Sequence, residues 1–143
     1  MRGIARDEAP SGDCEATIDG RSFASVATLM PDGSPQVTQT WVDHDGDIVV
    51  INTFEGSQKH RNVSRDPRIA LTVVDQKDEF NVAVIRGRVK EVTFEGAEDH
   101  IDKMAMKYTG QKYKRWMPQR RVLIKIEPRK VIPPWTDTSR KRS

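Results

Sequence analysis

Six short β-rich runs, separated by tight turns or helical segments, constrain the fold of this chain more than any other feature. The runs cover residues 23–30, 35–42, 47–53, 68–74, 80–92 and 120–126. Pro31 with Gly33, and Asp45 with Gly46, supply the dihedral angles that tight turns need. Strands at this spacing pair antiparallel and close into a barrel. The sequence therefore predicts a mainly β fold, a six-stranded antiparallel β-barrel with peripheral helices, whose first three runs form a meander.

Two segments change to a helical pattern. Residues 57–66 have little apolar content, and Ser57 is placed to cap a short helix that ends before Pro67. A longer helix is predicted over residues 95–108, with an apolar stripe of Ala97, Ile101, Ala105 and Tyr108 and with Met104 beside it. We therefore expect a loose N-terminal arm (1–20) with a single helical turn, a barrel domain (21–134) and a basic C-terminal tail (135–143).

The composition limits the class of protein. A chain of 143 residues is one domain, large enough to bury a core without a metal or a disulfide. Its single cysteine, Cys14, excludes a disulfide within the chain and favours a reducing cytoplasm. The first 13 residues lack the apolar segment of a signal peptide, and no apolar run is long enough to span a membrane. We expect a cytoplasmic protein with no membrane partner.

The charge is distributed unevenly along the chain. Residues 107–143 carry twelve Lys and Arg against two acids, a balance of +10, whereas residues 1–106 carry twelve against nineteen, a balance of −7. A basic segment of this kind indicates a polyanionic partner, or else a solvated face that continues into a frayed tail. Nucleic acid is not expected, because single-strand binding needs stacking aromatics beside the basic groups and only Trp116 lies in the basic loop.

Residues 53–62, TFEGSQKHRN, have the character of an anion-binding turn between a strand and a helix. Gly56 allows close approach of the backbone to a ligand. Ser57, Gln58 and Lys59 place a hydroxyl, an amide and an ammonium at a helix N-terminus, where free N–H groups and the helix dipole favour an anion. The alternative is an ordinary capped helix whose lysine is solvated.

The run at 35–42 is unusually polar for a barrel strand. Thr38, Gln39 and Thr40 are consecutive, between Val37 and Trp41. Such groups suit the polar edge of a heteroaromatic ring, although alternation lets Thr38 and Thr40 face solvent instead.

The three histidines, His44, His60 and His100, are scattered along the chain, with His100 expected on the exposed side of the second helix. Neither a metal site nor a hydrolytic triad is predicted, and no catalytic residue is assigned.

The chain resembles the pyridoxamine 5'-phosphate oxidase-like split β-barrel proteins, and among them the branch that uses the 8-hydroxy-5-deazaflavin coenzyme F-420. The resemblance covers residues 23–132, and its pieces are SVATLMPDGSPQVTQTWV, INTFEGSQKHRNVSRDPRIALTV, FNVAVIRGRV, KYTG and RRVLIKIEPRKV. It implies an FMN-binding type of split barrel that works as a homodimer, with the cofactor between the subunits and residues 80–84 supplied by the partner chain.

The resemblance also implies a set of cofactor-binding residues. The cofactor phosphate is expected at Ser57, Gln58, Lys59 and Asn62. The ring is expected over Gln36, Val37, Thr38, Gln39 and Thr40. Asn52 and Thr53 are expected beside the ribityl chain, and the basic loop at 112–121 beside the polyglutamate tail.

The implied function is that of an oxidoreductase, a reductase that transfers a hydride from a reduced deazaflavin to an electron-poor small organic substrate. FMN is the alternative cofactor, and a non-catalytic flavin or deazaflavin carrier or sensor is the alternative function. Flavin-phosphate oxidases of the broader family place more Arg around the phosphate, whereas this chain has Gln58 in the turn and no basic residue between Gln36 and Trp41. The difference favours the deazaflavin.

Overall fold

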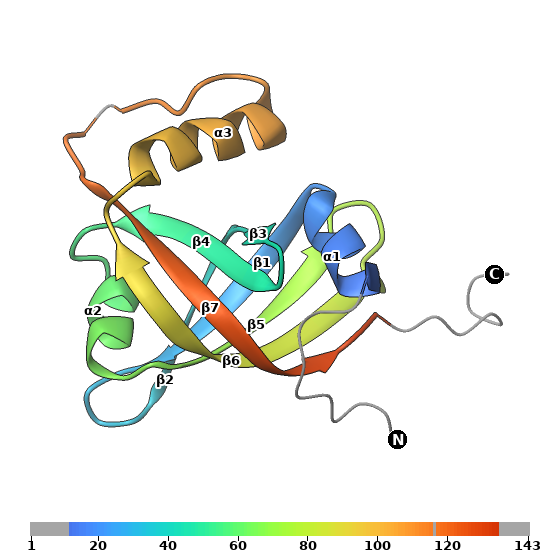
Figure 1. Ribbon diagram of the computed structural model, residues 1–143, viewed down its shortest axis with the longest axis horizontal. Coiled ribbons are helices and arrows are strands. Elements are labelled where there is room, and N and C mark those ends of the chain that lie inside the picture. The colour runs from blue at the N-terminus through green and yellow to red at the C-terminus, as the bar shows by residue number, and fades with distance from the viewer. Residues whose placement is uncertain (1–11, 116, 135–143) are drawn as a thin grey trace, which may run out of the picture.

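A computed structural model describes residues 12–115 and 117–134, and these form one curled antiparallel sheet with helices around it (Figure 1). The strands are β1 (Ser22–Leu29), β2 (Pro35–Trp41), β3 (Asp43–Asp45), β4 (Ile48–Phe54), β5 (Arg68–Asp75), β6 (Val82–Thr93) and β7 (Arg121–Ile132). The helices are α1 (Gly12–Asp19), α2 (Gln58–Arg65) and α3 (Ala97–Thr109). The mainly β fold predicted from the sequence is confirmed, and the predicted tail at 135–143 lies outside the described residues.

The described residues contain seven strands, so the prediction of six was wrong. The additional strand, β3, pairs antiparallel with β4 across a turn in which Gly46 has a φ of 60°. This turn was predicted, but the three residues before it were assigned to the turn itself. So short a strand carries too few residues to show alternation.

The predicted meander of the first three runs was right for β1 and β2, which pair antiparallel, and wrong for the third run. The strand order is β2-β1-β5-β6-β7-β4-β3, so β4 pairs with β7 and β3 and not with β2. The chain leaves β2 at one edge of the sheet and enters β3 at the other. A repeating apolar pattern shows that a segment is a strand, whereas the choice of neighbour depends on contacts distant in sequence.

The inner face of the curled sheet carries the core. Alternating side chains of β1, β5 and β6 point inward, among them Val26, Val73 and Ile85, which are fully buried. Ile18 of α1 joins this core, so the N-terminal arm holds an eight-residue helix where a single turn was expected. Burial of Ile18 gives the helix the packing that so short a segment needs in water.

Helix α3 covers the outer face of β4 and β7. Ala97 packs with Val50 and Leu123, and Ile101, Met104 and Ala105 are buried as the predicted stripe required. At its C-terminal end, the Tyr108 ring stacks on Trp41 with 4.9 Å between ring centroids. The Tyr108 hydroxyl donates to the Ser22 carbonyl at 2.5 Å.

An ionic contact attaches α3 to the short strand β3. The Asp43 carboxylate accepts from His100 Nε2 at 3.0 Å and lies 3.7 Å from the Lys103 ammonium. His100 was predicted on the exposed side of the helix, and this was wrong, because the addition of β3 gives that side a partner. Burial by itself raises the pKa of Asp43, but the hydrogen bond from His100 and the charge of Lys103 outweigh it, and the pKa falls to about 2.

Strands β6 and β7 bend where Gly87 lies opposite Pro128, with register shifts on both sides. A Cβ at Gly87 would lie 2.5 Å from the Glu127 carbonyl oxygen. We therefore expect Gly87→Ala to lower the free energy of unfolding by about 1–3 kcal/mol in chemical denaturation. Gly20→Ala is the matched control, because its Cβ would meet nothing closer than 3.6 Å. Equal stability of the two variants would contradict this account of the bend.

Replacement of Asp43 by Asn tests the ionic contact. Because folding lowers the pKa of this carboxyl from 3.8 to about 2, its ionisation stabilises the folded state above pH 4, and the contribution disappears as the pH falls toward 2. We expect Asp43→Asn to cost about 1–2 kcal/mol of unfolding free energy at pH 7 and almost nothing near pH 2. A difference that stays constant over this pH range would show that the charge is not responsible.

Candidate cofactor-binding cleft

The turn between β4 and α2 has the geometry that its sequence predicts. Gly56 has a φ of 87°, and Ser57 caps α2 by accepting the His60 N–H at 3.2 Å. The Thr53 hydroxyl donates to the same Ser57 oxygen at 2.9 Å. Both acceptor positions of the Ser57 hydroxyl are therefore used, and its own proton is left to be donated, with no acceptor for it among the described residues.

Asn62 links α2 to the sheet, and Gln58 of the same helix orients it. Gln58 Nε2 donates to Asn62 Oδ1 at 2.9 Å, and the fully buried Asn62 donates through Nδ2 to the Thr28 hydroxyl at 3.0 Å. The Thr28 hydroxyl in turn donates to Gln36 Oε1 at 3.5 Å. Three of the predicted cofactor-binding residues thus belong to one network that joins α2, β1 and β2.

Lys59 differs from these neighbours because no carboxylate of the described residues pairs with its positive charge. Its side chain is partly buried, and none of the carboxylates that the structure describes forms an ion pair with it. Burial lowers the pKa of Lys59 below its ordinary value, and the nearby positive charge of Arg121 lowers it further. Two cations held close together in this way favour an anion between them.

Strand β2 divides its polar residues between two faces. Gln36, Thr38 and Thr40 are paired with Thr28, Val26 and Ala24 of β1, so they share the inner face. Val37, 61% exposed, and Gln39 point the other way. The Thr38 Oγ1 atom is buried, and no group in the described residues forms a hydrogen bond with it. An unsatisfied buried hydroxyl costs free energy, which a bound ligand would recover.

A cleft of about 490 Å³ opens between β2 and the β4, β7 and α3 layer. Its lining residues are Phe23, Gln39, Thr40, Trp41, Asn52, His100, Ile101, Met104, Tyr113 and Arg121. The structure therefore brings three predicted residues, Gln39, Thr40 and Asn52, to one cleft. Phe23, Trp41 and Tyr113 add aromatic rings to the polar groups, a mixture suited to a planar heteroaromatic ligand.

Arg121 is the main cleft residue that was not in the predicted site. It is 7% exposed, and its Nε donates to Asn52 Oδ1 at 2.9 Å. The sequence placed it at the end of a basic loop, and only its position at the start of an apolar strand indicated burial. The loop itself is partly neutralised, because Arg115 pairs with Glu98 and Asp102 at 3.1 and 2.9 Å.

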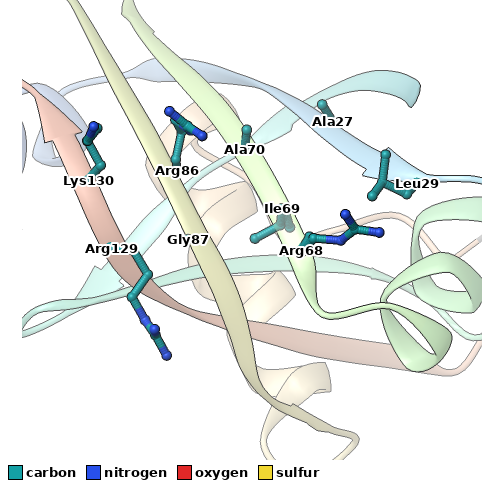
Figure 2. Close-up of a pocket in the computed structure, with 9 residues that line it drawn as sticks. All are labelled: Ala27, Leu29, Arg68, Ile69, Ala70, Arg86, Gly87, Arg129 and Lys130. Carbon is teal, nitrogen blue, oxygen red and sulfur yellow. The ribbon is translucent and has the colours of Figure 1, made fainter. Parts of the chain in front are cut away.

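A second hollow, of about 430 Å³, lies on the outer face of the sheet (Figure 2). Its lining includes the small residues Ala27 and Ala70 and several basic side chains. Arg86 and Lys130 stand opposite each other on β6 and β7, and neither forms an ion pair with a described residue. In Figure 2 these two side chains point the same way, and Arg129 extends away from them.

Other kinds of site find no support in the described residues. No group of three or more His, Cys, Asp or Glu side chains there is arranged to hold a metal ion. Within the same part of the chain, no helix combines the length and the apolar character that a membrane span requires.

Comparison with known proteins agrees with this architecture. The family model described as pyridoxamine 5'-phosphate oxidase matches residues 11–133. A solved structure named as an F-420 reductase is 25% identical, with a TM-score of 0.74, and the match covers 85% of this chain and 97% of that one.

Two further structures share the fold at lower identity. A conserved hypothetical protein from Mycobacterium tuberculosis is 22% identical with a TM-score of 0.64, over 89% of this chain and 86% of that one. General stress protein 26 from Bacillus anthracis is 18% identical with a TM-score of 0.64, over 83% and 88%. With the family model matched along most of its length, the chain belongs to the pyridoxamine 5'-phosphate oxidase family, a flavin-binding family of split β-barrels that includes oxidoreductases.

Proposed function

We propose that this protein is a deazaflavin-dependent reductase, which uses reduced coenzyme F-420 to transfer a hydride to an electron-poor small organic substrate. The observation that carries the proposal is the buried Arg121, which lines an aromatic-walled cleft and has the partly buried Lys59 near enough for the two positive charges to affect each other. A phosphorylated heteroaromatic cofactor offers both an anion for the cations and a planar ring for the cleft. The F-420 reductase likeness at 25% identity supports the same cofactor.

The residues of the turn and of β2 fit such a cofactor. Lys59 and the unused Ser57 proton would hold the phosphate at the N-terminus of α2, where the helix dipole also favours an anion. Thr40 lines the cleft and would meet the polar edge of the ring, and the unsatisfied Thr38 hydroxyl lies on the same face of β2. Gln39 also borders the cleft, although its side chain points to the other face of the strand. Asn52 and Thr53 follow at the end of β4, where they would border the sugar-like chain.

Some predicted residues would act indirectly. Gln36, Gln58 and Asn62 would hold α2 in place through their shared hydrogen bonds. Val37 would offer apolar surface, since its side chain is 61% exposed.

When bound, the deazaflavin supplies the hydride chemistry, and the protein supplies binding, orientation and exclusion of water. Trp41 stacked on Tyr108 forms a rigid wall on one side of the cleft, and Ile101 and Met104 of α3 form an apolar wall. An apolar wall keeps water from the reacting atoms.

FMN is the second candidate cofactor, because the family binds flavins. The turn argues against it, since Gln58 stands where the flavin-phosphate oxidases of the broader family place an Arg, and its side chain is engaged with Asn62 and Arg61. The basic segment after Tyr108 favours a ligand with a longer anionic tail, as F-420 has.

We further propose a cytoplasmic homodimer built on the outer face of the sheet. In the described residues no helix covers Ala27, Ala70 and Val37 on that face, and Phe80 is 55% exposed. A second copy would bury these apolar groups and place residues 80–84 close to the partner's cofactor.

Titration with coenzyme F-420 and with FMN, followed by fluorescence or calorimetry, tests the cofactor. We expect wild-type protein to bind F-420 more tightly than FMN. Lys59→Ala should weaken F-420 binding about 10- to 100-fold, the value of a charge-assisted hydrogen bond. Lys90→Ala is the matched control, because Lys90 is an exposed lysine of β6 far from the turn in sequence. No binding of either cofactor would overturn the proposal.

A second measurement distinguishes a reductase from a non-catalytic cofactor carrier. In the presence of a quinone or an unsaturated carbonyl compound, reduced F-420 bound to the protein should be oxidised faster than free reduced F-420. A loaded protein that protects the cofactor from every such acceptor would be a carrier.

A further inference from the structure

The guanidinium of Arg121, which lines the cleft, has N–H groups that form no hydrogen bond with the described residues. Arginine carries five N–H donors. Within the described residues, Nε donates to Asn52 Oδ1 at 2.9 Å and Nη1 donates to the Tyr113 hydroxyl at 3.4 Å. The other N–H groups of the guanidinium have no acceptor there, although the residue is 7% exposed and lines the cleft.

The charge of Arg121 is compensated only in part, because the nearby Glu98 attracts it but no described carboxylate forms an ion pair with its guanidinium. Glu98, the acid beside it, accepts from the Arg121 backbone N–H at 2.9 Å and pairs with the guanidinium of Arg115. Exposed arginines of the same chain do find carboxylates, as Arg68 does with Asp66 at 2.8 Å. A buried cation is normally paired, because its desolvation is costly unless an anion offsets it.

A chain of hydrogen bonds through Asn52, His100 and Asp43 holds the guanidinium of Arg121 in place. Asn52 must turn Oδ1 toward Arg121, because its Nδ2 donates to the Ala97 carbonyl at 3.0 Å and meets His100 Nδ1 at 3.1 Å. An amide nitrogen only donates, so His100 accepts at Nδ1 and carries its proton on Nε2. That proton is donated to Asp43 at 3.0 Å.

We infer that Arg121 binds an oxyanion of the ligand that enters the cleft, and that Asn52, His100 and Asp43 are positioning residues which aim its guanidinium. The inference deepens the proposed function by naming a recognition residue for an acidic ligand. Three N–H groups in one plane form a fork that matches a phosphate or a carboxylate. The oxyanion is either the cofactor's phosphate or a carboxylate on the substrate.

Arg121→Gln tests the inference, with Arg120→Gln as the matched control. Arg120 is adjacent and exposed, and its guanidinium lies over the Phe94 ring at 3.8 Å. Each protein is titrated with F-420, with inorganic phosphate, and with cinnamate after loading with oxidised F-420. We expect Arg121→Gln to lose about 10- to 100-fold in affinity for one of the oxyanion ligands, and Arg120→Gln to change little.

The three titrations identify the source of the oxyanion. Weaker binding of F-420 and inorganic phosphate by Arg121→Gln assigns the guanidinium to the cofactor phosphate. Unchanged F-420 affinity with weaker cinnamate binding assigns it to a substrate carboxylate. Unchanged affinity for all three ligands overturns the inference. If wild-type protein binds no cofactor, the proposed function fails, and phosphate and cinnamate titrations of the cofactor-free protein still decide the role of Arg121.

A double-mutant cycle tests the positioning residues. Asn52→Leu removes the acceptor at Arg121 Nε, and we expect it to weaken the same ligand by several-fold or more. In the background of Arg121→Gln the same substitution should have little further effect on affinity, because the group that it positions is gone. Equal effects of Asn52→Leu in both backgrounds would overturn the positioning role, because Asn52 would then act through its own contact with the ligand or through stability, and thermal unfolding of each variant measures stability independently.

Discussion

The pairing of β6 with β7 is the constraint on which the rest of the structure depends. These two strands join the half made of β2, β1 and β5 to the half made of β4 and β3. Their register shifts near Gly87 and Pro128, where a residue without a side chain meets one without an N–H. Such irregularities increase the twist of a sheet. The sheet therefore curls around the core, and its two edge regions, β2 and the β4–β3 hairpin, approach without pairing and leave the cleft between them.

Unpaired charges and an unsatisfied hydroxyl in and around the cleft lower the stability of the folded state, and a bound ligand would offset this cost. Among the described residues, no carboxylate forms an ion pair with Lys59 or with the Arg121 guanidinium, and the Thr38 hydroxyl, on β2 at the edge of the cleft, is buried without a hydrogen-bond partner. A folded protein pays for such groups with stability that the core must provide, and strain of this kind gathers at functional sites. The hydrogen bonds from Arg121 through Asn52 and His100 to Asp43 show that the guanidinium is held in one orientation, which is what recognition of a single ligand group requires.

Much of the fold was predictable because it depends on local pattern. The β-rich runs between turns identified β1, β5 and β6 with small errors at their ends, and the helix stripe of Ala97, Ile101 and Ala105 was confirmed as the buried face of α3. The short β3 was missed because three residues show no period. The neighbour of β4 was assigned wrongly, because the apolar side chains of β4 and β7 find each other across more than sixty intervening residues.

For the site, the sequence alone determined the chemistry of the turn: a glycine, a capping serine and a lysine at the start of a helix, which by themselves favour an anion. It also determined that Thr38 and Gln39 lie on opposite faces of β2, since alternation follows from backbone geometry. Only the tertiary structure decided that Lys59 stands close to Arg121, that Asn62 is buried against Thr28, and that His100 meets Asp43. These contacts join elements far apart in the chain, and they form because the sheet curls and α3 closes over it, which no local pattern encodes.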